Sequence, residues 1–145
     1  MSSVSATMTR DHRDCDELFA AAETKVTIGD WPGAVRAFES FRGGMERHFR
    51  VEEEALFPAF EAHTGMTAGP TQVMRMEHAE MRELFDRLAA AAAARDADEF
   101  LGLAETLNLL IQQHNMKEEQ VLYAMLDASL GPDAEKLLAA FATAS

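Results

Sequence analysis

The stretch HFRVEEEALF at positions 48–57 returns as HNMKEEQVLY at positions 114–123, 66 residues further along the chain (114 − 48 = 66). The same shift carries His12 onto His78, so four of the five histidines obey one internal symmetry. An internal repeat of this kind indicates two copies of one supersecondary unit, because each copy buries its apolar face against the other. We therefore expect two helical hairpins related by a pseudo-twofold axis.

Apolar residues recur at spacings of three and four along nearly the whole chain, which is typical of amphipathic helices. The expected helices cover residues 9–26, 31 to just beyond 58, 71–94 and 99–129, with a short amphipathic helix at 134–141. Short connections make consecutive helices antiparallel neighbours. The sequence therefore predicts an all-α fold, an up-down-up-down antiparallel four-helix bundle plus a short C-terminal helix.

This bundle is expected to form one domain over residues 1–145. Repeat 1 spans about 5–63, repeat 2 about 71–129 and the C-terminal helix about 133–143. The Gly- and Pro-containing segment 63–70 reads as the loop between the repeats.

Composition excludes several classes of function. The formal net charge is −12, from 25 acidic and 13 basic residues, whereas nucleic acids and anionic membranes are bound by clustered Lys and Arg. The single cysteine, Cys15, excludes an intramolecular disulfide and a cysteine-based zinc site. The N-terminal residues lack the apolar core of a signal peptide, and no stretch reaches the length of a membrane span. We expect a cytoplasmic protein without a nucleic-acid or membrane partner.

Each repeat carries a His-x-x-x-Glu unit, His48 with Glu52 and His114 with Glu118. Residues four apart in a helix lie about 40° apart around its axis, one turn along. Both units share their face with apolar residues and so point inward, where an unpaired carboxylate is costly. A hydrogen-bonded polar cluster, salt bridges to arginine or a metal would each satisfy them.

The symmetry favours the metal, because a dinuclear site needs nitrogen and oxygen donors from several helices. Two imidazoles for each metal and two carboxylates that span both supply this. Such a ligand set suits iron or manganese better than zinc. The predicted ligands are His12, His48, Glu52, His78, His114 and Glu118.

Segments 48–58, 77–78 and 114–119 resemble the hemerythrin-like (HHE cation-binding) family, and the resemblance covers almost the whole chain. It implies a cofactor of two iron ions, oxo- or hydroxo-bridged and carboxylate-bridged, that reacts with dioxygen, peroxide or nitric oxide. Ferritin-like di-iron proteins instead use Glu-x-x-His units and mostly carboxylate ligands. In the oxygen-carrying hemerythrins a His-x-x-x-His unit on the third helix supplies a further imidazole. Here Met74 stands four residues before His78, so both irons are expected to accept an exogenous ligand.

Four residues near the predicted ligands leave alternatives open. Glu53 and Glu119 are rotated about 100° from the predicted ligands, towards a helix boundary or solvent. Glu119 nevertheless remains an alternative to Glu118 as the bridging carboxylate. Asp16 and its repeat mate Arg82, the residue 66 positions further along in the second repeat, are expected to pair and orient imidazoles. The alternative is that Asp16 is an additional iron ligand.

Other residues are expected to be structural. Met8, Met74 and Cys15 read as core, and His63 as an exposed loop residue. Tyr123 points away from the His114 stripe in a regular α-helix and receives no catalytic role. Gly44 leaves room either for a ligand channel or for a close helix contact.

Two classes of function remain. One is a redox-active di-iron protein that handles peroxide or nitric oxide, or repairs damaged iron centres, with an electron donor as partner. The other is a non-catalytic module for oxygen or iron sensing, storage or delivery, the last to an iron-accepting protein.

Overall fold

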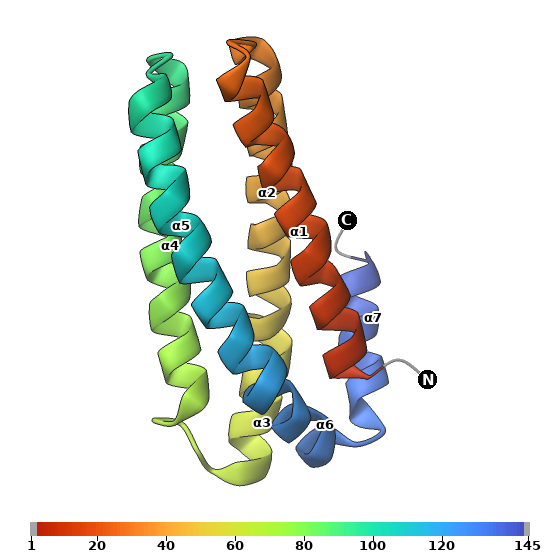
Figure 1. Cartoon of the computed structure of the whole chain (residues 1–145). Helices are drawn as coiled ribbons and strands as arrows, with labels where there is room; N and C mark the ends of the chain where they lie inside the picture. Colours follow the sequence, from red (N-terminus) through yellow and green to blue (C-terminus); the bar gives the residue numbers. More distant parts are fainter. Residues whose placement is uncertain (1–2, 144–145) are drawn as a thin grey trace.

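The structure is a computed structural model that describes residues 3–143, with side chains as far as Ala139. In chain order its elements are α1 (Val4–Thr27), α2 (Trp31–Val51), the π-helix η1 (Glu52–Leu56), α3 (Phe57–Thr64), α4 (Pro70–Ala93), α5 (Ala97–Lys117), the π-helix η2 (Glu118–Leu122), α6 (Tyr123–Leu130) and α7 (Asp133–Thr143). The segments α2–η1–α3 and α5–η2–α6 each form one continuous helical rod (Figure 1).

The predicted fold is confirmed: the described residues form an antiparallel four-helix bundle with a short C-terminal helix. Figure 1 shows two hairpins, α1 with α2 and α4 with α5. Between the hairpins, α1 contacts α5 and α2 contacts α4, and α7 packs against α1, α2 and α6. Within residues 3–143, no helix combines the length and apolar character needed to cross a membrane.

The hairpin turns are set by capping residues. Asp30 begins α2 by accepting a hydrogen bond from the Gly33 amide at 3.0 Å, and Asp96 begins α5 in the same way with Glu99 at 3.1 Å. Such side chains satisfy amides that have no partner within the first helical turn. Gly65 ends α3 with φ +73°, a left-handed conformation that glycine adopts without strain.

Both long rods contain a π-helical turn that the sequence periodicity did not predict. Phe57 N–H bonds the Glu52 carbonyl, and Tyr123 N–H bonds the Glu118 carbonyl, both across five residues. Pro58 lies in the first turn of α3, directly after the wide turn. Its repeat mate is Ala124. The π-turn is therefore a property of the repeat and not of the proline.

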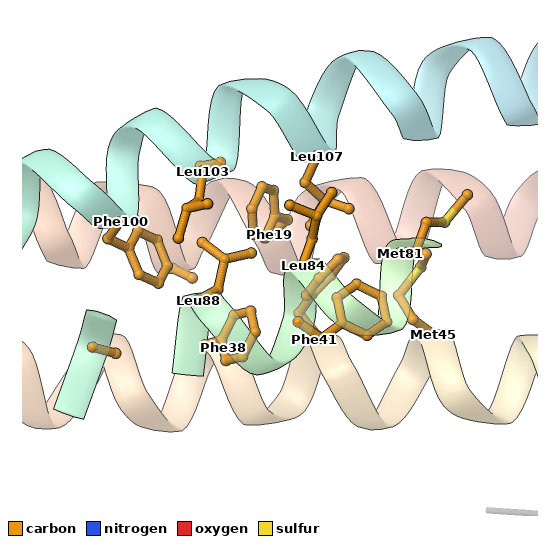
Figure 2. Close-up of a cluster of buried hydrophobic side chains, with 14 of the residues drawn as sticks. Phe19, Phe38, Phe41, Met45, Met81, Leu84, Leu88, Phe100, Leu103 and Leu107 are labelled. Atoms are coloured by element: carbon orange, nitrogen blue, oxygen red, sulfur yellow. The ribbon is translucent and has the colours of Figure 1, made fainter. Parts of the chain in front are cut away.

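Two apolar clusters fill the bundle on either side of the histidine layer. The larger one lies between the hairpin turns and that layer, and Figure 2 shows Phe19, Phe38, Phe41 and Leu88 meeting between the helices. The second cluster gathers the N-terminal turns of α1 and α4 with α3, α6 and α7. The polar layer thus lies inside a continuous apolar bundle, which fixes the helices that present its side chains.

Candidate metal centre

The structure brings the six predicted ligands into one buried layer. Each of α1, α2, α4 and α5 contributes one histidine, and each π-helix begins with one of the two glutamates. Their exposed fractions are 5% or less: His12, His48, Glu52, His78, His114 and Glu118.

These side chains form two overlapping groups that could each hold a metal ion. Glu52, His78, His114 and Glu118 make one group, and His12 and His48 make the other with Glu118; within each, the candidate ligand atoms lie within 4.8 Å of one another. Both groups fit the imidazole and carboxylate donors that iron accepts. The buried His and Glu clusters therefore fit a metal site.

Every imidazole in the layer is oriented by a carboxylate at its Nδ1. The contacts are His48 with Asp11 at 2.6 Å, His12 with Glu119 at 2.7 Å, His78 with Glu53 at 2.6 Å and His114 with Glu77 at 2.7 Å. We assign the hydrogen to Nδ1 from these contacts, because a carboxylate only accepts. Each Nε2 then directs a lone pair into the layer, as in histidines that bind metals.

Inside the layer, hydrogen-bond acceptors on the imidazoles lie next to hydrogen-bond acceptors on the carboxylates. His78 Nε2 lies 3.1 Å from Glu52 Oε1, and His114 Nε2 lies 3.2 Å from Glu118 Oε1. Among the described residues, the buried side-chain atoms without a hydrogen-bond partner are these two nitrogens together with Glu52 Oε1 and Glu118 Oε2. Buried polar atoms are rarely left unpaired, so cations are needed to satisfy this group of acceptor atoms.

Without a metal, protons are the cations available. Burial disfavours a charged imidazole, but the charge of Glu118 outweighs it and raises the pKa of His114 to about 9. Burial likewise opposes the charge on His48, while Glu52 and Asp11 raise the pKa of that imidazole well above its usual range. The site therefore holds positive charge, as protons or as metal, near neutral pH.

Tyr123, to which the sequence assigned no role, lies in the centre of the layer. Its Oη is 2.8 Å from Glu52 Oε2, 2.9 Å from Glu118 Oε1, 3.0 Å from His12 Nε2 and 3.3 Å from His48 Nε2. In a regular α-helix Tyr123 would be rotated about 140° from Glu118. The π-turn bonds the Tyr123 N–H to the Glu118 carbonyl, five residues earlier, and this wider turn brings Tyr123 below Glu118 on the same face.

Glu53 and Glu119 lie at helix boundaries, as expected, with side chains 23% and 35% exposed, and each also accepts a hydrogen bond from an imidazole of a neighbouring helix, which was not expected. For Glu53, burial opposes ionisation, but hydrogen bonds from His78 and Arg82 lower its pKa to about 2. Asp11 and Glu77 were missed as partners. The sequence did contain a sign of their role, because each directly precedes a site histidine and the two positions are repeat mates.

The expected pair of Asp16 with Arg82 is not formed. Arg82 on α4 binds Glu46 and Glu53, both from the α2 rod, whereas Asp16 on α1 pairs with Gln112. In the bundle α1 packs beside α2 and α5, so α4 lies diagonally across from it.

The expected core residues are confirmed, but His63 lies in the last turn of α3 and not in a loop. Met8, Met74 and Cys15 are buried, and burial raises the pKa of the Cys15 thiol to about 12. The His63 side chain is 48% exposed. A Cβ at Gly44 would lie 3.5 Å from Cys15 Sγ, an ordinary van der Waals distance, so Gly44 lies where α1 and α2 pack together but this contact does not require a glycine.

Comparison with known families gives one match. The model of the hemerythrin HHE cation binding domain matches residues 3–126 of the 145-residue chain. No significant match was found among curated proteins or among solved structures.

Proposed function

The chain belongs to the family of hemerythrin HHE cation-binding domains, and on this premise we propose that it binds two iron ions and reacts with a small oxidant, namely dioxygen, peroxide or nitric oxide. His78 and His114 would hold one iron, and His12 and His48 the other. Glu52 and Glu118 would contact both, because Glu118 is shared by the two groups and Glu52 directs one oxygen to each side.

The observation that carries this proposal is the group of opposed acceptors in the layer. Four buried atoms lack a partner, and a single Tyr123 hydroxyl hydrogen meets two carboxylate oxygens and two imidazole lone pairs. A pair of multivalent cations balances this set without protonating it. Bound iron would supply electrons and an open coordination position to the small molecule.

The protein itself contributes orientation, a proton and the exclusion of water. The four carboxylates at Nδ1 hold the imidazoles in place. Burial and the charges of Glu118 and Glu52 raise the pKa of Tyr123 well above its usual range, so its Oη keeps a hydrogen. Phe49 stacks on His78 with ring centroids 3.9 Å apart and shields that side from water.

Anaerobic loading with ferrous iron followed by addition of dioxygen tests the proposal. We expect about two irons per chain, consistent with the ligand set, and irreversible conversion to a diferric optical spectrum, after which peroxide and nitric oxide are compared. A charge-transfer band that disappears when oxygen is removed would instead indicate a carrier or sensor. Iron content well below two would contradict the di-iron assignment itself.

Single-residue variants test the ligand assignment. His48→Ala and His114→Ala should lose iron, because each removes an imidazole of the layer. His63→Ala is the matched control, since its side chain is half exposed and lies near Asp133. Equal iron loss from all three variants would contradict the assignment.

A further inference from the structure

We propose that a pocket between α2 and α4 binds the electron donor of the metal site, and that this donor is a small hydroquinone. Its ring lies against apolar side chains of both helices, and its hydroxyl groups donate to Glu39 and Glu46 of α2. The inference rests on the proposed function, because a site that has reduced an oxidant must be reduced again, and it names the class of molecule that supplies the electrons.

The pocket has the size and the walls of a small-molecule site. Its volume is about 450 Å³, within the range of ligand pockets in proteins. The lining from α4 consists of alanines only, and these small side chains leave space in front of the Phe38 ring on α2. The apolar lining residues are Val35, Phe38, Ala89, Ala92 and Ala93. Walls of this kind suit a flat apolar ring.

The polar residues of the pocket favour a ligand that donates hydrogen bonds. Among the described residues, Glu39 has no hydrogen-bond or ion-pair partner, and Glu46 accepts from Arg82 Nε at 2.8 Å. Carboxylates only accept, so both complement O–H groups. The one cation that lines the pocket, Arg42, is bonded to Asp86. An anionic ligand would therefore meet unpaired negative charge.

The spacing of the two carboxylates matches a hydroquinone. Glu39 and Glu46 are seven residues apart on one helix, or about 10.5 Å along its axis. A single ring with hydroxyl groups at opposite ends, each forming a hydrogen bond of about 2.7 Å, spans a similar length. The quinone formed by oxidation carries carbonyl acceptors in place of the donors, so it no longer complements the carboxylates and leaves the pocket.

Aromatic rings connect the pocket with a histidine of the metal layer. Arg42 lies over the Phe85 ring, 6.0 Å from its centroid. Phe85 stacks on Phe49 with centroids 6.2 Å apart and planes at 11°, and Phe49 stacks on His78 at 3.9 Å and 17°. Glu46, at the end of the pocket, lies only three residues before Phe49. Because electrons tunnel more readily through packed atoms than across open space, a donor in this pocket can reduce the metals without entering their layer.

The electron and proton count of the step is balanced. The hydroquinone loses two electrons and two protons and leaves as the quinone, and each of two ferric ions takes one electron. Glu39 is exposed at the mouth of the pocket, so the protons released there pass to water.

Binding to the metal-free protein tests the pocket apart from the metals. Anaerobic calorimetric titration with tetramethylhydroquinone should give one bound molecule per chain. Ala89→Leu should weaken this binding at least about tenfold, because the larger side chain fills the space in front of Phe38. Glu39→Ala should weaken it about fivefold by removing one hydrogen-bond acceptor. Ala90→Leu, an exposed change outside the pocket, is the matched control and should bind like the wild type.

Stopped-flow reduction of the diferric protein tests the electron transfer. At a subsaturating concentration, tetramethylhydroquinone should reduce Ala89→Leu at least about tenfold more slowly than the wild type, in proportion to the lost affinity. Dithionite, a small anion that does not need the pocket, should reduce both proteins at the same rate.

The possible outcomes separate this inference from the proposed function. A metal-free wild type that binds no hydroquinone, or equal binding and reduction in the wild type and Ala89→Leu, would overturn the inference and leave the proposed function intact. If circular dichroism shows that Ala89→Leu does not fold, Ala93→Leu, an exposed position on the same wall, takes its place. A wild type that holds fewer than two irons, or that dithionite does not reduce, contradicts the proposed function instead.

Discussion

The Nδ1–H of His48 donates to Asp11 Oδ2 across 2.6 Å, with both side chains almost completely buried. The bond joins α2 to α1 and turns Nε2 of the imidazole into the polar layer. A buried carboxylate in this position fixes the ring and makes the nitrogen opposite a better ligand. Glu77 does the same for His114 across the pseudo-twofold axis.

Asp11→Asn should therefore weaken iron binding about 10–100-fold, the usual effect of removing such a partner. The amide keeps the size of the side chain but removes its charge. Competition with a calibrated chelator measures the effect. Asp14→Asn, an exposed change on the same helix, should leave iron affinity unchanged, and equal affinities for the two variants would contradict the role of Asp11.

Arg82→Gln should lower the reduction potential of the site. Arg82 donates to both oxygens of Glu53 at 3.1 Å, and Glu53 accepts from His78. Without the cation, the full carboxylate charge acts on that imidazole and stabilises ferric iron. Arg82 is 36% exposed, so solvent screens the effect to about 1 kcal/mol, equivalent to about 40 mV for one electron.

Spectroelectrochemical titration checks this shift. Arg87→Gln is the matched control, because Arg87 lies on the same helix with 63% of its side chain exposed, near Glu99. A potential that rises in Arg82→Gln, or falls equally in Arg87→Gln, would contradict the assignment. The repeat mate of Arg82 is Asp16, so the cation acts on the His78 side of the layer.

The bundle and the six ligand candidates could be predicted because both follow from positions along the chain. The shift of 66 residues pairs the histidines, and the spacing of four places each glutamate beside its histidine. Burial in the structure agrees with this part of the prediction.

The partners at Nδ1 could not be predicted in the same way. Asp11 reaches His48 from another helix, and which helices are neighbours depends on the packing of the whole bundle. The position of Tyr123 depends on one extra residue in the turn of η2, and hydrophobic periodicity assumes a constant turn.

The metal-free and iron-loaded proteins should respond to pH in opposite directions. In the metal-free protein the pKa of His114 is raised from 6.5 to about 9, with burial opposing the charge and Glu118 favouring it. Stability from the protonated ring is fully present below pH 6.5 and is lost as pH rises through 9. The loss from this one group is up to about 3 kcal/mol.

Iron binding requires unprotonated imidazoles, so the loaded protein should instead lose iron and stability as pH falls. Urea unfolding at pH 6.5, 7.5 and 9 with and without iron measures both trends. Parallel curves for the two forms would show that the four histidines do not bind the metal.

Deletion of Gln120 should remove the π-turn and leave the helical bundle folded. Gln120 is exposed and lies inside η2, which holds one residue more than an α-turn. Its removal lets α5 continue into α6 as an α-helix, with Tyr123 then one turn below Glu118. The later side chains keep their faces, so helicity measured by circular dichroism should be retained.

The same deletion should impair the site, because Glu119 would turn about 100° from Glu118 and lose its 2.7 Å contact with His12 Nδ1. Iron affinity should therefore fall as far as in Glu119→Gln. Deletion of Glu105, an exposed residue in the α-helical part of α5, is the control. That change rotates the buried residues on one side of the deletion relative to the other and should unfold the bundle. If the Gln120 deletion unfolds the protein to the same extent, the π-turn is part of the fold and not a local adaptation that lets two consecutive glutamates reach the site.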